Sequence, residues 1–395
     1  MSDQVYLELI KKLKADPDAA LTELSKLLMP SQAAALAARV AEYNSKETKA
    51  TRFGLYPIQD MGSFKLCKAL QGQYWVADEL KFSEDLNDFN NLTLSEQNLL
   101  LTIFGFFAIG DGVISSMLAY QMMLINPSMS KSCFYALQLA NEMIHAETYG
   151  QMIFTLVSDP IKRDEIFNAV SNVESIKNLS KFVEDSFLNP SGDRDLYFAL
   201  AAAEYVFFTP MFCCIFWFRA FKPGKIHNII LSNTFIARDE GLHCKNGCYN
   251  YFSLPREEKF TQGELNTKIQ EVVSLVDKFT EYMFVSQNIK MGELNLANTN
   301  QYVRYVADDL LVRMGHKVFY NVSNPYVWMD YTSLVPKENF YEKVVTNYSR
   351  VDVEKSVKLA EQLMLGKSAV QPTVAIEEVK ALVIKETPVP DDIAF

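Results

Sequence analysis

The stretch LYFALAAAEYVFFTPMFCCIFWF, Leu196 to Phe218, is apolar or small at nearly every position and carries one acid, Glu204, near its middle. So long an apolar run is typical of a helix buried inside a large bundle. A carboxylate in an apolar interior costs several kcal/mol unless it is paired, bound to a cation or neutralised. We therefore expect the rest of the chain to supply a partner for Glu204.

The same stretch is also long enough to cross a bilayer. However, Glu204 would lie near the membrane centre, and Pro210 would break the helix shortly afterwards. The other apolar run, Leu99 to Ile109, is too short to span and stops at Asp111. The sequence therefore predicts no membrane partner.

The composition favours a globular protein with a sizeable core. Of the 395 residues, 49% are hydrophobic and 12% aromatic, while the formal net charge is -10. An acidic chain without clustered Lys and Arg is a poor ligand for phosphate backbones, so we expect no nucleic-acid partner. The N-terminal residues include acids and no apolar signal region, and the six cysteines show no disulfide-framework spacing, so we expect a cytoplasmic location and reduced cysteines.

Apolar residues recur at helical spacing through most of the chain, and strand signals are nearly absent, which predicts an all-α fold. Residues 1–50 are predicted to form a helical N-terminal extension, and 51–350 the main domain. Residues 351–395 read as the end of a helix followed by a flexible tail that closes with Phe395. The helical runs expected within the main domain are 130–158, 193–219, 227–253, 262–290 and 298–317.

Two Glu-x-x-His motifs suggest a metal site: Glu142 with His145, and Glu240 with His243. Residues three apart share a helix face, so each motif directs a carboxylate and an imidazole toward one place. Two such helices, with a carboxylate from each of two further helices, make the dimetal site of ferritin-like bundles. Glu204 would be one of those carboxylates. The alternative is that both motifs are helix-surface pairs and Glu204 is a neutralised core acid.

Motifs between about Arg52 and Arg350 resemble those of the small, radical-generating subunit of class I ribonucleotide reductase. They are RFGLYPI, YWVADEL, NEMIHAETY, AEYVFF, ARDEGLHC, YVADDLL, NPYVWM and NFYEK. The resemblance implies a ferritin-like bundle, a homodimer or heterodimer of small subunits, and a large partner subunit that reduces ribonucleotides. It also implies a cofactor of iron or manganese, with two ions in the family.

The resemblance further implies roles for individual residues. Tyr149 matches the tyrosine that is oxidised to a stable radical, and Asp239 belongs to the path that the radical would follow. The C-terminal Phe395 would dock on the large subunit. The implied metal ligands are Glu142, His145, Glu204, Glu240 and His243, and the implied apolar neighbours of the radical are Phe208 and Phe212.

Three departures from the family pattern are expected to affect the chemistry. We place Lys81 at the position of an Asp metal ligand and Phe64 at the position of the relay Trp, and the tail has no Tyr after Tyr348. Three carboxylates and one ammonium balance a single divalent ion, so we expect one metal, or none with Lys81 bridging Glu142 and Glu204. Less favoured alternatives are a neutral Lys81 as an amine ligand, or a substitute ligand from Asp78, Glu84 or Asp85.

Three functions are compatible with these observations. The first is a small subunit that uses dioxygen at a metal site to oxidise Tyr149. The second is a ligand-deficient homologue that stabilises or regulates a competent partner subunit. The third is a different carboxylate-metal protein on the same bundle, such as an oxidase or a metal store.

Overall fold

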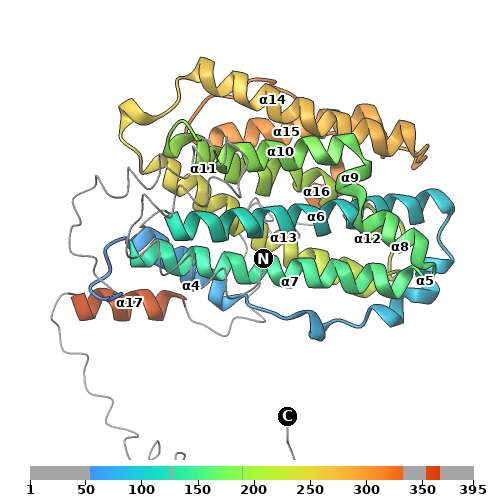
Figure 1. The fold of residues 1–395 in the computed structure, drawn as a ribbon, viewed down its shortest axis with the longest axis horizontal. Coiled ribbons are helices and arrows are strands. Elements are labelled where there is room, and N and C mark those ends of the chain that lie inside the picture. The colour runs from blue at the N-terminus through green and yellow to red at the C-terminus, as the bar shows by residue number, and fades with distance from the viewer. Residues whose placement is uncertain (1–53, 125–127, 189, 332–352, 365–395) are drawn as a thin grey trace, which may run out of the picture.

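The computed structural model describes residues 54–331, apart from 125–127 and 189, together with residues 353–364 (Figure 1). This part of the chain is helical, and its only β-type pairing is an isolated bridge between Met291 and Leu294. The predicted all-α fold is confirmed. The longer helices are α4 (Met61–Gly72), α6 (Leu94–Leu124), α7 (Met129–Leu156), α10 (Glu174–Leu188), α11 (Asp193–Ala202), α12 (Thr209–Phe221), α13 (His227–Phe252), α14 (Gln262–Glu281), α15 (Leu296–Arg313) and α17 (Val353–Met364).

Shorter segments connect or extend these helices. They are η1 (Ala77–Glu79), η2 (Phe82–Asp85), α5 (Leu86–Asn90), α8 (Pro160–Phe167), α9 (Ala169–Asn172), η3 (Ala203–Phe207), η4 (Arg256–Glu258), η5 (Tyr282–Ser286) and α16 (Val327–Tyr331). The five predicted helical runs correspond to α7, to α11 through α12, to α13, to α14 with η5, and to α15. The predicted segment 1–50 lies outside the described residues; of the predicted segment 351–395, α17 is described and 365–395 lies outside them.

The apolar stretch Leu196 to Phe218 is interrupted in the middle, at Glu204. Helix α11 passes into one π-helical turn, η3, and α12 then begins with Pro210 in its first turn. A π turn inside a long helix is rare and is frequent at functional sites. Here it changes the register between α11 and α12 at the residue that carries the buried charge.

Two helical segments are long and apolar enough to span a membrane by composition alone. Their apolar windows, within Leu94–Ala119 and Asp193–Phe221, are 61% and 100% buried inside the protein. Both belong to the core of the bundle, and each carries two buried acids: Glu96 and Asp111 in the first, and Asp195 and Glu204 in the second.

Helices α6 and α7 run side by side through the middle of the molecule, with α13 behind them (Figure 1). On one side lie α14, α15 and α10, and on the other lies α4, against which α17 packs. The start of α13 is fixed by Asp85, whose carboxylate accepts the backbone N–H groups of Asn228 and Ile229 at 3.2 and 2.7 Å. This arrangement directs residues of α6, α7, η3 and α13 toward one interior point.

Candidate metal centre

Six buried side chains from four helical elements meet in the interior of the bundle. They form two overlapping groups of four, which share Glu142 and Glu240. The first group adds Asp111 of α6 and His145, and the second adds Glu204 of η3 and His243. Within each group, one potential ligand atom per residue lies within 4.8 Å of the others. All six side chains are at most 1% exposed. The structure therefore brings together the five residues predicted from sequence and adds Asp111.

Both imidazoles turn Nδ1 toward the carboxylates. His243 Nδ1 lies 2.8 Å from Glu240 and 3.0 Å from Glu142, and His145 Nδ1 lies 2.9 Å from Glu240. Although His145 Nδ1 and this oxygen of Glu240 are so close, neither atom has a hydrogen-bond partner. Both oxygens of Asp111 and one oxygen of Glu204 are also without one.

The pKa values reflect the crowding of four acids in a space without solvent. Burial, reinforced by the neighbouring carboxylates, raises the pKa of Asp111 and Glu204 well above the ordinary range. Burial alone would lower the pKa of His243, but Glu142 and Glu240 raise it to about 10. Bound cations would relieve this crowding of buried charge.

Polar residues around the cluster orient its members. The imidazole of His145 presents Nε2 to Asp239 at 3.3 Å, and Asp239 in turn accepts the indole N–H of Trp75 at 2.8 Å and the amide of Gln73 at 2.6 Å. The amide of Gln138 donates to Glu204 at 2.7 Å. A second partner for the outer nitrogen of a histidine is typical of metal-binding imidazoles.

The donor set fits two divalent cations. Carboxylates and imidazoles are the usual ligands of iron and manganese, and four carboxylates carry the charge that balances two divalent ions. The unpartnered oxygens and the outward bond from His145 to Asp239 are what such ions would require. Helix-surface pairing, the alternative considered from sequence, does not fit side chains that are fully buried.

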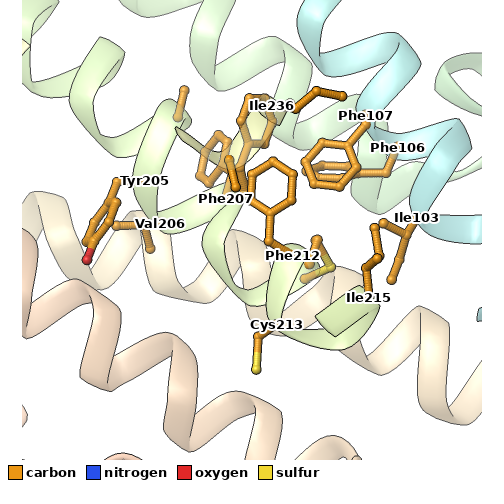
Figure 2. Packing of buried hydrophobic residues seen from close by; sticks show 14 of the residues in the cluster. Ile103, Phe106, Phe107, Tyr205, Val206, Phe207, Phe212, Cys213, Ile215 and Ile236 are labelled. Atoms are coloured by element: carbon orange, nitrogen blue, oxygen red, sulfur yellow. The ribbon is translucent and has the colours of Figure 1, made fainter. Parts of the chain in front are cut away.

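Tyr149 lies one turn beyond His145 on α7 and is fully buried. Its ring stacks on Phe107 with centroids 4.9 Å apart, and Phe104 lies 6.0 Å away. The ring of Phe107 in turn packs on Phe212, with centroids 4.6 Å apart (Figure 2). The centroid of Phe208 lies 5.2 Å from that of Phe107, so the two predicted neighbours extend the apolar wall behind Phe107. Burial, with the nearby Asp111 carboxylate, raises the pKa of Tyr149 well above its ordinary value.

Lys81, predicted at the position of a metal ligand, is not among the residues that the structure brings together in the cluster. Lys81 lies just before η2, with an exposed side chain, and its backbone N–H donates to Asn228. The carboxylate absent at Lys81 is supplied from α6 by Asp111. The substitute ligands considered, Asp78, Glu84 and Asp85, are also elsewhere: the first two are exposed, and Asp85 caps α13.

The assignment of Phe64 to the relay position also differs from the structure. Phe64 is buried in a small cluster with Ile58 of the loop before α4 and Ala360 of α17. It is Trp75 whose indole contacts Asp239 and stacks near the ring of His145, with centroids 6.1 Å apart. The tail that lacks tyrosine and ends at Phe395 lies outside the described residues.

Comparison with known proteins places this geometry in a family. The model of the family described as "Ribonucleotide reductase, small chain" matches residues 52–325. The ribonucleoside-diphosphate reductase small subunit of Dictyostelium discoideum is 33% identical over 311 residues, which cover 78% of this chain and 89% of the relative. The small chain of Variola virus is 32% identical over 305 residues, covering 76% and 92%.

Solved structures agree in fold. The Rnr4 homodimer of Saccharomyces cerevisiae has a TM-score of 0.63 and 22% identity, covering 72% of this chain and 90% of that one. The dimanganese(II) NrdF of Streptococcus sanguinis has a TM-score of 0.60 and 19% identity, covering 68% and 94%. The predicted ferritin-like bundle and the resemblance read from the motifs are both confirmed.

Proposed function

We propose, since the chain belongs to the ribonucleotide reductase small-chain family, that it binds two metal ions at the six-residue cluster and uses dioxygen to oxidise Tyr149 to a radical. The radical would serve a large subunit that reduces ribonucleoside diphosphates. The observation that carries this proposal is the complete set of four carboxylates and two imidazoles beside a fully buried tyrosine.

The metal count in this proposal differs from the one expected from sequence. With Asp111 in the cluster and Lys81 outside it, four carboxylates face the site, and two divalent ions balance them. When bound, the metal pair would supply one-electron oxidising power by activating dioxygen. Carboxylate-rich sites with imidazole suit both iron and manganese, so either ion is compatible with this donor set.

The chain's own residues would bind the ions, orient the ligands and exclude water. Asp239 fixes the ring of His145, and the amide of Gln138 fixes the carboxylate of Glu204. Phe104 and Phe107 keep water from the phenol ring, which favours a long-lived radical. Hydrogen bonds link His145 to Asp239 and Asp239 to Trp75, in a direction away from the cluster. This series would connect the site that contains Tyr149 with the large subunit.

Pairing with a second small subunit belongs to the same proposal. Helices α6 and α7 are adjacent and leave exposed small or apolar residues on their outward faces, including Gly112, Ala136 and Met143. We place the second subunit, identical or homologous, on this surface, which we call the α6–α7 face. A homodimer is the form named for the related Rnr4 structure.

The deciding experiment is anaerobic loading with ferrous iron or manganese, followed by oxygen exposure, metal analysis and electron paramagnetic resonance. Two ions per chain and a tyrosyl signal that disappears in Tyr149→Phe are expected. Two ions without any radical would instead favour the homologue that acts only through its partners. Fewer than two ions would contradict the proposed ligand set.

A further inference from the structure

We propose that Asn233 is a positioning residue for Tyr149, which holds the hydroxyl of the reduced phenol and thereby disfavours its oxidation. The inference rests on the function proposed above and deepens it. It concerns a residue of α13 that belongs neither to the six-residue cluster nor to the aromatic wall around Tyr149.

The contact is direct and buried. The hydroxyl of Tyr149 donates to Oδ1 of Asn233 at 2.8 Å, and both side chains are 0% exposed. The two residues come from different helices, α7 and α13, and lie 84 positions apart. This is the hydrogen bond that the structure describes for the Tyr149 hydroxyl.

The backbone determines which way the amide faces. Nδ2 of Asn233 donates at 2.8 Å to the carbonyl oxygen of Ile229, one turn earlier on α13. A carbonyl can only accept, so the NH₂ group must face Ile229 and the amide oxygen must face Tyr149. The Tyr149 hydroxyl is therefore the donor, and its proton points at a neutral acceptor.

An amide oxygen accepts a hydrogen bond but is too weak a base to take the proton. Oxidation of the phenol to a neutral radical removes one electron and one proton, and both must pass to the dioxygen-derived oxidant. The hydroxyl must first leave Asn233. Once the hydrogen is gone, the radical oxygen faces the lone pairs of Oδ1 with no donor between them, so the contact favours the reduced form.

The principal test is Asn233→Leu, which keeps a side chain of similar size and removes the acceptor. At equal metal content, the Tyr149 radical should persist roughly two to ten times longer, the factor expected for losing one neutral hydrogen bond. The matched control is Ser232→Ala, because Ser232 also donates to the carbonyl of Ile229 at 2.8 Å but has no described bond to Tyr149. Its radical lifetime should equal that of the wild type.

A second measurement needs no radical and no substitution at Asn233. Infrared spectra of metal-free protein with ring-deuterated tyrosine, minus those of Tyr149→Phe, isolate the C–O stretch of Tyr149. A frequency typical of a donating hydroxyl supports the proposal, and one typical of a free or accepting hydroxyl overturns it. This arm stands even if Asn233→Leu fails to fold.

The outcomes separate the two proposals. A wild-type protein that binds two ions but forms no radical would refute the function proposed above and, with it, the effect of Asn233 on oxidation, while the infrared band would still show whether Tyr149 donates a hydrogen bond. A radical of unchanged or shorter lifetime in Asn233→Leu, with Ser232→Ala normal, would overturn the role of Asn233 and leave the proposed function intact.

Discussion

The indole nitrogen of Trp75 lies 2.8 Å from a carboxylate oxygen of Asp239, and the same oxygen lies 3.3 Å from His145. Asp239 therefore joins a buried aromatic residue outside the cluster to a residue of the candidate metal cluster. All three side chains are at most 4% exposed, so the connection is shielded from competing water. A path away from the cluster is thus present in the described part of the chain, although it does not involve Phe64.

Replacing Trp75 by Phe should separate radical formation from turnover. The ring is kept, but the N–H that donates to Asp239 is lost. We expect unchanged metal content and a normal Tyr149 radical, with ribonucleotide reduction in the presence of the large subunit lowered about 10- to 100-fold, as for a lost hydrogen bond to a charged group. Stopped-flow absorption and a turnover assay measure the two quantities.

The control for that experiment is Phe64→Leu, in the residue to which the sequence assigned the relay. Phe64 packs against Ile58 and Ala360 and has no described contact with Asp239. Turnover in Phe64→Leu should stay near the wild-type value. Equal losses in both variants would argue that stability rather than the path through Trp75 was measured.

Substitutions of Asp111 and of Lys81 should affect metal binding differently. Asp111→Asn removes one of four buried carboxylates, so bound metal should fall from two ions per chain to about one, because the remaining charge balances fewer cations. Lys81→Asp should leave the metal content unchanged, since Lys81 is exposed. Mass spectrometry of the desalted protein measures both, and a gain of metal in Lys81→Asp would restore the role that the sequence suggested.

Much of the fold and most of the cluster follow from the sequence. The 3.6-residue periodicity is strong in long helices, so the helical runs were predicted correctly, and both Glu-x-x-His pairs lie on single helix faces. Glu204 was found because a lone acid in an apolar run needs a partner.

The same argument applies to Asp111, which follows the apolar run Leu99 to Ile109. Helix α6 does not end there but continues through Asp111. The sequence pattern assigns the remaining ligand position to Lys81, and Asp111 is read there only as the end of a run too short to span a membrane. Trp75 and Gln73 follow α4 in an irregular segment, where no periodicity predicts orientation. Only the packing of this segment on α13 brings Trp75 to Asp239.

Asp60 should make the stability of α4 depend on pH. It caps α4 by accepting the N–H of Ser63 at 3.0 Å, and it also accepts the hydroxyl of Tyr249 at 2.7 Å. Burial opposes ionisation, but these bonds outweigh it and lower the pKa of Asp60 below 3.8. Because the pKa is lower in the folded state, the stabilisation is complete at pH values above the unfolded-state pKa of 3.8. It is lost as the pH falls through the pKa of Asp60 in the folded state.

Asp60→Ala should therefore lower the free energy of unfolding by about 1 kcal/mol at pH 7, the usual cost of losing an N-cap. The difference from the wild type should shrink in acid, once the wild-type carboxyl is protonated. Urea unfolding at pH 7, 5 and in acid near the folded pKa measures it. A difference that stays constant into acid would show that the ionised form contributes nothing.

Met143 tests the proposed pairing through the α6–α7 face. Its side chain is 59% exposed on α7, beside the buried Glu142. Met143→Glu would place a charge without a partner in a buried apolar interface, so the dissociation constant of the dimer should rise at least about tenfold. Leu94→Glu is the matched control, because Leu94 is 70% exposed at the beginning of α6 and away from Met143 along the helix pair. Sedimentation velocity over a range of concentrations distinguishes the cases: a weakened dimer in Met143→Glu alone supports the face, and equal behaviour of the two variants assigns the second subunit elsewhere.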